Sequence, residues 1–399
     1  MDNYKKLNVL FLPAWYPNRN DSMWGLFVQR HALAVKAFCN VNVLYICPDE
    51  NLKKENFDVE VITENGIIEV KVYYKQVKTK IPIISNFLKA YRYFIANYAG
   101  YKILKNSVGK PDITHVNVLT RAGILALYLK YFKRIPYVIT EHWSRYLPTV
   151  DAYKGCLKKN LTEKIVKNAG AVATVTEDLR NAMLNHALKN DNYLLLNNVV
   201  DTEFFSPNYS KIINQKKRII HISTFDDKSK NISGILRALK ILSEKRQDFE
   251  CRMIGEGIDF EQLKQYADEL KIKDSFVFFC GLKENNALAN EINNADFMLL
   301  FSKYENMPVV INESFACGIP VLSTNVGGIS EHLNQENGIF VNTNDEEDLI
   351  SKLDFMLDNF QKFDSKKIRK YAVDNFSNQK VGEKIFEIYS NVLKKTKNK

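Results

Sequence analysis

Two glutamates, Glu305 and Glu313, stand eight positions apart at the point of the chain best suited to ligand chemistry. The apolar run 297–301 before them predicts a buried strand, Pro308 suits the first turn of a helix, and Gly318 suits the position just past its end. Glu305 is therefore expected in the loop after a strand and Glu313 on the following helix. Carboxylates accept hydrogen bonds from sugar and ribose hydroxyls, and a helix N-terminus favours phosphate. The set suits a nucleoside diphosphate sugar.

The same residues carry a family resemblance. Glu305 and Glu313 reproduce the E-x7-E motif of the family 4 glycosyltransferases, retaining enzymes of the two-domain GT-B architecture, and the sequence ACGIPVLSTNVGG that follows resembles the usual continuation of that motif. The resemblance implies that Glu305 contacts the donor sugar and Glu313 the ribose. It also places the main chain of four further donor-binding residues near the sugar and phosphates: Asn306, Met307, Pro308 and Val309. The alternative is a pair of solvated glutamates at a helix end.

A second segment, residues 222–231, follows the expected strand 218–223. The family places a Gly-Arg pair and then a lysine here. Lys230 fits the lysine, and its ammonium group would offset the negative charge that grows on a departing diphosphate. Thr224 stands where the arginine is expected, so one cationic contact is missing or is supplied by another residue, for which Lys228 is the candidate.

Two adjacent acids in this segment, Asp226 and Asp227, raise the question of a metal site. Adjacent acids beside lysines are more often a solvated turn than a metal-binding DxD motif. Enzymes of the GT-B type generally work without a bound metal. We therefore expect no metal and no cofactor, with the nucleotide sugar acting as substrate.

Two residues of the first half are further candidates. His142 directly follows the expected strand 137–140, and loops at that position commonly carry catalytic side chains. The family has a histidine there near the donor sugar, whereas a lone histidine is usually structural. Gly25 precedes the expected helix 26–38, where a glycine permits close approach of the backbone to a diphosphate; the alternative is an ordinary turn glycine.

A weaker signal lies at Leu282, where the resemblance implies that main-chain groups receive the nucleotide base. Gly327 and Gly328 offer amides near the phosphates by the same resemblance. Taken alone, each of these positions is an ordinary turn between a strand and a helix.

The arrangement of elements predicts an α/β fold with two parallel sheets, because short apolar strands alternate with helical segments in both halves. The expected strands are 8–12, 41–46, 113–116, 137–140 and 171–175, then 218–223, 250–254, 276–279, 297–301 and 320–323. By resemblance these form two Rossmann-like domains that face each other across a cleft. We expect an acceptor-binding domain at 1–200, a nucleotide-sugar domain at 201–375, and a C-terminal helix with a basic tail at 376–399 that packs toward the first domain.

Charge differs between the halves. Residues 1–200 hold 28 Lys and Arg against 16 Asp and Glu, whereas residues 201–399 hold 28 against 30. The first half is therefore expected to meet an anionic surface or ligand. The segment 86–105 has the composition of a basic interfacial helix, although packing against a sheet explains it equally well. No nucleic-acid motif accompanies it, so nucleic acid is not an expected partner.

The chain shows neither a secretory signal nor a stretch long enough to span a bilayer, and its six cysteines form no CxxC pair. We expect a cytoplasmic protein, in contact with the inner face of the cytoplasmic membrane, that moves a sugar from a UDP- or GDP-linked donor to a hydroxyl of a lipid-linked glycan in cell-surface polysaccharide synthesis. One alternative is a catalytically silent subunit, because of Thr224. A nicotinamide-dependent oxidoreductase is disfavoured because no GxGxxG loop follows the first strand.

Overall fold

The computed structural model describes residues 6–52, 56–76, 82–119, 121–148, 150, 152–208 and 215–397. The last two residues of the expected basic tail lie outside that part of the chain. Contacts divide the chain into two compact units. Unit 1 comprises Met1–Val175, Leu179–Val199 and Asn378–Lys399, and unit 2 comprises Thr176–Asp178 and Val200–Ser377.

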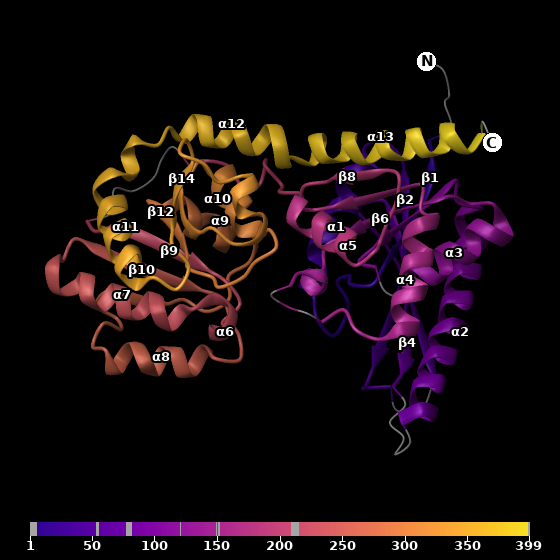
Figure 1. Ribbon diagram of the computed structural model, residues 1–399, viewed down its shortest axis with the longest axis horizontal. Coiled ribbons are helices and arrows are strands. Elements are labelled where there is room, and N and C mark those ends of the chain that lie inside the picture. The colour runs from indigo at the N-terminus through magenta and orange to yellow at the C-terminus, as the bar shows by residue number, and fades with distance from the viewer. Residues whose placement is uncertain are drawn as a thin grey trace. The chain divides into compact units, whose positions relative to one another are not determined.

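Unit 1 is built on an eight-stranded sheet with the order β3-β4-β2-β1-β5-β6-β7-β8. Its elements run from indigo to magenta in Figure 1, apart from the yellow C-terminal helix. Its strands are β1 Asn8–Pro13, β2 Asn40–Asp49, β3 Phe57–Glu64, β4 Ile67–Lys75, β5 Ile113–Asn117, β6 Tyr137–Glu141, β7 Ala171–Thr174 and β8 Tyr193–Leu195. All neighbours are parallel except β3, which pairs antiparallel with β4. The antiparallel pairing at this edge follows from the tight turn at Asn65 and Gly66, which joins β3 directly to β4.

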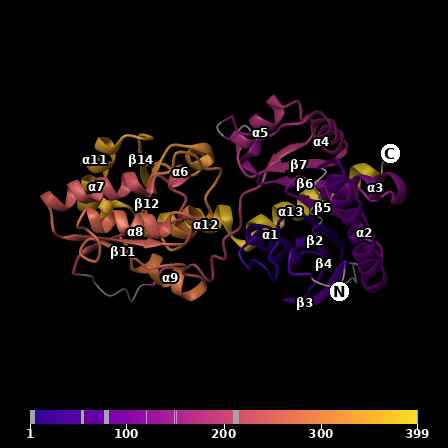
Figure 2. The ribbon, with the colours of Figure 1, turned by 90° about the horizontal axis from the view of Figure 1, so that it is seen from below.

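Helices cover both faces of this sheet (Figure 2). One face carries α2 Pro82–Val108, α3 Ala122–Lys133, α4 Cys156–Asn168 and α5 Glu177–Asn185, and the other carries α1 Leu26–Lys36 and the C-terminal helix α13 Asn378–Lys397. Helix α13 packs on α1 through Gly382, where an added methyl group would lie 2.3 Å from the Ala34 carbonyl oxygen. The last helix of the chain is thus an integral part of unit 1.

Unit 2 contains six strands that are all parallel, in the order β11-β10-β9-β12-β13-β14. Its strands are β9 Lys217–Ile222, β10 Phe249–Ile254, β11 Val277–Phe279, β12 Phe297–Leu300, β13 Val321–Thr324 and β14 Gly338–Val341. One face packs against α7 Ile232–Lys245, α8 Phe260–Glu269 and α11 Glu346–Asn359, and the other against α9 Asn285–Asn294, α10 Val309–Ala316 and α12 Ser365–Phe376.

Each sheet has one point at which the strand order reverses direction. In unit 1 it lies between β1 and β5, and in unit 2 between β9 and β12. Helices that leave the two strands at such a point go to opposite faces, so the loops at the carboxyl ends separate and leave a crevice where ligands of open α/β sheets bind. The topology therefore marks one candidate binding region in each unit.

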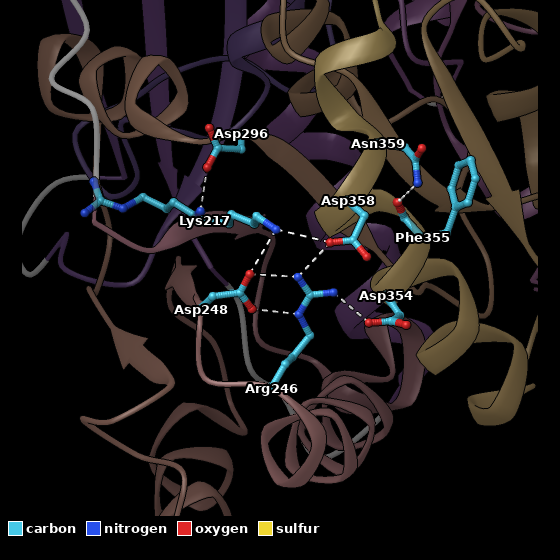
Figure 3. Close-up of polar contacts among 9 residues, drawn as sticks. Lys217, Arg246, Asp248, Asp296, Asp354, Phe355, Asp358 and Asn359 are labelled. Carbon is cyan, nitrogen blue, oxygen red and sulfur yellow. Dashed lines mark hydrogen bonds and ion pairs between the residues drawn. The ribbon is translucent and has the colours of Figure 1, made fainter.

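A network of charged residues joins elements at the amino ends of the unit 2 strands (Figure 3). The Arg246 guanidinium group contacts Asp248 at 2.7 Å, Asp354 at 2.7 Å and Asp358 at 2.9 Å, and the Lys217 ammonium group lies 2.9 Å from Asp248. Both cations hold the pKa of the Asp248 carboxyl well below its usual range. The network joins the end of α7 to α11 and to the start of β9.

Replacing Arg246 should lower the thermal stability of the protein. Arg246→Met leaves three carboxylates close together without their central cation, so the melting temperature should fall by several degrees at low salt and by less in 0.5 M NaCl, because the repulsion is screened. Differential scanning fluorimetry measures both. Lys240→Met is the matched control: it removes only one exposed helical pair with Glu244, a contact of about 0.3 kcal/mol. Equal shifts for the two variants would contradict the account.

Candidate active site

The reversal point of unit 2 is held open by a buried histidine. Strands β9 and β12 pair at only two positions, Ile219 with Phe297 and Ile220 with Met298. Beyond them the His221 ring bridges the strands: its Nδ1 donates to the Leu299 carbonyl at 2.9 Å and its Nε2 lies 2.8 Å from the Ser223 hydroxyl. A carbonyl only accepts, so the proton must be on Nδ1 and Nε2 must accept from Ser223. Burial lowers the pKa of His221 to about 4, which keeps the ring neutral.

An ion pair stands at the mouth of this opening. Lys230 ends the short helix α6 Asp227–Lys230 after β9, and Glu305 lies in the loop after β12. The Lys230 Nζ atom is 2.5 Å from Glu305 Oε1, which also accepts from the Ser302 hydroxyl at 2.8 Å. Both side chains are largely buried, and no described residue donates to Glu305 Oε2. The ammonium group has three protons, so two remain for a ligand.

The loop that carries Glu305 is fixed from several sides. The Lys303 amide donates to the Ser229 carbonyl at 2.8 Å, and the Thr324 hydroxyl donates to the Ser302 carbonyl at 2.7 Å. Gly327 has φ +56°, and an added methyl group would lie 2.1 Å from the Glu305 carbonyl oxygen. The position of Glu305 therefore depends on a glycine in the loop after β13.

The remaining residues of the motif follow as helix α10. Pro308 is its N-cap, one position earlier than the first turn expected from the sequence, and Val309 is its first residue. Asn306 accepts a hydrogen bond at its carbonyl from the Gly328 amide at 2.8 Å, and Met307 packs into the core. Glu313 is buried in the second turn of α10. The motif thus forms one continuous piece of structure at the carboxyl edge of the sheet.

Three other predicted residues occupy neighbouring loops of the same edge. Thr224 and Lys228 are exposed after β9, and Leu282 is exposed after β11. The loops are tied through Gly255, whose amide donates to the Gly281 carbonyl at 3.0 Å. Lys228 lies on α6, two positions before Lys230. Its role as the cation in place of the arginine expected at Thr224 stays a prediction.

The adjacent acids have structural partners. The Asp227 carboxylate accepts from the Ser233 amide and hydroxyl, both at 2.7 Å, and the Asp226 carboxylate accepts from the Ser229 hydroxyl at 2.9 Å. Such contacts fix α6 and the start of α7. Among the described residues no group of three or more His, Cys, Asp or Glu could hold a metal ion.

In unit 1 the site candidates follow β6. The buried Glu141 carboxylate accepts from the amides of His142 and Trp143 at 2.9 Å each, and from the Leu119 amide at 2.9 Å. Burial raises the pKa of Glu141, an effect that Arg145 opposes. This carboxylate joins the loops that follow β5 and β6, and so fixes the position of His142.

His142 lies in a cluster of neutral rings. Its ring centre is 4.5 Å from that of Phe27 and 5.2 Å from that of His31, both on α1. His115 on β5 completes the group, with its two nitrogens 2.7 Å from the Tyr389 and Thr140 hydroxyl oxygens. Burial lowers the pKa of His31 to about 4, of His115 to about 3, and of His142 well below its ordinary value.

The structure requires a glycine at position 25 for a reason that the sequence did not reveal. It is the N-cap of α1 with φ +70°, and an added methyl group would lie 2.3 Å from the backbone carbon of Trp15. The close approach that requires glycine is made by the chain itself. Contact of Gly25 with a diphosphate remains a prediction.

Sequence reasoning missed an aromatic cluster beside these residues. The ring centre of Trp15, just after β1, lies 5.4 Å from that of Trp24, 5.1 Å from that of Trp143 and 6.2 Å from that of Phe27. These are all three tryptophans of the chain, gathered at the reversal point of unit 1, and Trp24 is 43% exposed. The signal available in the sequence was the place of Trp15 and Trp143 directly after two strands.

The family model of glycosyl transferases group 1 matches residues 205–374, and that of glycosyltransferase family 4 matches residues 50–204. The chain belongs to the GT-B glycosyltransferases of family 4. The predictions of an α/β fold with two parallel-sheet domains and of a glycosyltransferase enzyme are confirmed.

This glycosyltransferase is similar to several named enzymes. It is 27% identical to N-acetyl-alpha-D-glucosaminyl L-malate synthase of Bacillus anthracis, over 72% of this chain and 76% of that one. It is 22% identical to the capsular polysaccharide biosynthesis glycosyltransferase CapM of Staphylococcus aureus, over 88% and 94%. The fold matches the crystal structure of Anabaena HepE in complex with UDP, with a TM-score of 0.70 at 14% identity, over 96% of this chain and 100% of that one.

The buried histidines make the stability of the glycosyltransferase sensitive to acid. A histidine whose folded pKa lies below its unfolded value of 6.5 stabilises the protein fully above pH 6.5, and this contribution is lost as pH falls toward the folded pKa. Each such ring in unit 1 should lower the free energy of unfolding by about 1.4 kcal/mol when the pH falls from 7.5 to 5.5. Urea unfolding followed by tryptophan fluorescence reports on unit 1, which holds every tryptophan.

His115→Phe is the variant that checks the cause. It removes two hydrogen bonds, so it should lower the free energy of unfolding at pH 7.5, and it should also shrink the loss between pH 7.5 and 5.5 by about 1.4 kcal/mol. An unchanged pH dependence in this variant would show that the His115 ring is not held neutral.

Proposed function

We propose that this glycosyltransferase moves a sugar from a nucleoside diphosphate sugar to an acceptor hydroxyl, with the donor bound at the reversal point of unit 2. The observation that carries the proposal is the Lys230–Glu305 pair at the carboxyl ends of β9 and β12, beside the N-terminus of α10. A cation, a carboxylate with one unused oxygen and a helix N-terminus offer partners for a diphosphate and for sugar hydroxyls in one place.

The residue roles follow from charge and position. Lys230 donates hydrogen bonds from its two remaining N–H groups to the diphosphate. Its charge offsets the negative charge that grows there as the bond to the sugar breaks. Glu305 Oε2 accepts from a hydroxyl of the transferred sugar. Glu313 binds the ribose, and His142, as a neutral ring, binds the sugar. The main chain around Asn306 to Val309 holds sugar and phosphate oxygens, and Leu282 lies by the base.

The proposed reaction retains configuration at the anomeric carbon. The bond from that carbon to the leaving phosphate oxygen breaks, the acceptor oxygen bonds to the same face, and the leaving phosphate takes up the acceptor's proton. The nucleoside diphosphate then carries the negative charge that Lys230 stabilises. The steps need no metal, so transfer should continue in excess EDTA.

We favour a UDP-linked donor over a GDP-linked one, because HepE was crystallised with UDP and shares the fold. For the acceptor we propose a lipid-linked glycan in cell-surface polysaccharide synthesis, which the similarity to CapM supports. The enzyme would then work in the cytoplasm at the inner face of the cytoplasmic membrane. In keeping with a reducing compartment, all six cysteines are free thiols.

We place the acceptor at the reversal point of unit 1, on the cluster of Trp15, Trp24 and Trp143. The less polar face of a pyranose ring presents C–H groups, which the negative face of an indole attracts, and an aromatic contact of this kind contributes about 1 kcal/mol. Trp24 offers the exposed ring, and His142 lies next to the cluster through Phe27.

Glu305→Gln tests the donor site. It keeps the shape of the side chain but removes the charge opposite Lys230, so transfer should fall about 100-fold or more. Because a lone buried charge is itself destabilising, the double variant Glu305→Gln with Lys230→Met is measured beside it: it should melt nearer the wild type yet remain as inactive. A panel of UDP-, GDP- and ADP-sugars in a radiolabel transfer assay measures activity. If Glu305→Gln turns over as fast as the wild type, the proposed role of Glu305 in donor binding is refuted. If the wild type is folded but inactive with every donor, the alternative of a catalytically silent subunit is favoured.

The acceptor site has an optical test. Methyl glycosides of hexoses and N-acetylhexosamines, titrated without donor, should quench the tryptophan fluorescence, and Trp24→Ala should weaken that binding about fivefold or more. Met23→Ala, at the equally exposed neighbouring position, should leave it unchanged. If Trp24→Ala binds every glycoside as tightly as the wild type does, the acceptor is bound elsewhere.

A further inference from the structure

Three helices that cover one face of the unit 1 sheet expose apolar side chains to solvent in regular stripes. Along α2 these are Tyr91, Phe94 and Tyr98, along α3 Ile124, Tyr128, Tyr131 and Phe132, and along α4 Leu157 and Leu161. The spacings of three and four residues place each set on one side of its helix. Tyr98 is 62% exposed, Phe132 72% and Leu157 87%. Single exposed apolar side chains are common, but several gathered on one surface mark a site of interaction with a protein or a membrane.

The stripes belong to one surface. All three helices lie on the same face of the sheet (Figure 2). Their buried residues belong to one core, so their exposed sides point away from it together. Helices α2 and α3 are neighbours, since the Arg121 guanidinium group at the start of α3 lies 5.8 Å from the centre of the Tyr93 ring on α2. Helices α3 and α4 touch where Gly123 packs against Ile165. We call the surface of α2, α3 and α4 the helical face.

The charge of the helical face is almost wholly positive. Helices α2, α3 and α4 contain ten Lys and Arg and a single acid, Glu163. On α2 the aromatic stripe continues at the same spacing into Lys102 and Lys105, and on α4 the stripe of Leu157 and Leu161 continues into Lys164, all exposed. Cations that prolong an apolar stripe suit a boundary between hydrocarbon and anionic head groups.

A hollow at the ends of α3 and α4 adds to this picture. It has a volume of about 1080 Å³, and its walls carry more cations than acids. The cations are Lys130, Arg134, Lys167, Lys189 and Lys395, and the acids are Glu163 and Asp191. A hollow of this charge and size accommodates an anionic head group.

We propose that the helical face is a docking surface for an anionic lipid bilayer, on which it lies with its aromatic side chains at the depth of the head groups. No helix among the described residues has the length and apolar content needed to cross a bilayer, so the contact is peripheral. The sequence pointed only to the segment 86–105 and left packing against the sheet as an equal explanation. The structure makes the two compatible, because α2 buries Ala96, Tyr101 and Leu104 and exposes the other side.

The inference rests on the proposed function and deepens it, since a protein docked on the bilayer lies close to a lipid-linked acceptor. Vesicle binding needs no sugar donor, however, so the two can fail separately. An enzyme that transfers sugar but ignores vesicles would overturn only the docking surface. An enzyme that binds vesicles without sugar transfer would overturn only the proposed reaction.

The experiment is co-sedimentation of the full chain with vesicles of phosphatidylcholine, with and without 30% phosphatidylglycerol. Binding should require the anionic lipid and weaken with salt, because it depends on Lys and Arg near the surface. Two triple variants alter exposed positions only: Lys102→Glu, Lys105→Glu and Lys164→Glu for charge, and Phe94→Ser, Tyr98→Ser and Phe132→Ser for the stripes. Each lysine contributes about fivefold, so the charge variant should bind about 100-fold more weakly or worse; the aromatic variant should lose at least tenfold.

The matched control makes the same change of net charge on exposed lysines of unit 2: Lys362→Glu, Lys366→Glu and Lys367→Glu. It should bind like the wild type, and all variants should melt near the wild-type temperature, which confirms that they fold. The proposal is overturned if phosphatidylglycerol vesicles are not bound, if either triple variant binds normally, or if the control loses as much. A wild type that forms a dimer which the aromatic variant abolishes, without vesicle binding, would assign the face to a second copy instead.

Discussion

The site of unit 2 depends on one ion pair, that of Lys230 with Glu305, held where β9 and β12 part. Two charged groups taken out of water are stable only with good geometry and further hydrogen bonds, and here Ser302 supplies one to the carboxylate. The backbone around the pair is fixed by Ser229, Thr324 and Gly327, so the charges are in place before a ligand arrives. Preorganised charge of this kind costs little reorganisation during a reaction.

The ion pair exists because the strands beneath it diverge. Strands β9 and β12 share only two paired positions, and the neutral His221 ring satisfies the polar groups that a longer ladder would have paired. In unit 1 the buried Glu141 has the corresponding task, since it collects the amides that follow β5 and β6. A buried titratable group thus fixes loops at the carboxyl ends of the strands in each unit.

Much of this arrangement could be read from the sequence. The strand before Glu305, the helix that carries Glu313 and the glycine that ends it follow from local preferences, which the tertiary structure obeys because they agree with the parallel sheet. Only the family resemblance placed Lys230 in the donor site, and in the structure it forms an ion pair with Glu305. The residues named for the site and the expected absence of a metal stay predictions, because no ligand contact tests them.

The edge strand β3 was missed although residues 57–61 alternate apolar and polar side chains and the Asn65–Gly66 turn after them indicates a hairpin. Other features could not be predicted, for physical reasons. The contacts of His31 with His142 and of Trp15 with Trp143 join residues far apart in the chain, and the contact of Gly25 with Trp15 depends on how the loop between them folds.

The most direct test of the central claim is a crystal structure of the enzyme with a UDP-sugar bound. The account predicts diphosphate oxygens within about 3 Å of Lys230 Nζ, a sugar hydroxyl on Glu305 Oε2 and the ribose on Glu313. A nucleotide bound away from the carboxyl ends of β9 and β12, with the contact between Lys230 and Glu305 untouched and both side chains free of ligand, would contradict it.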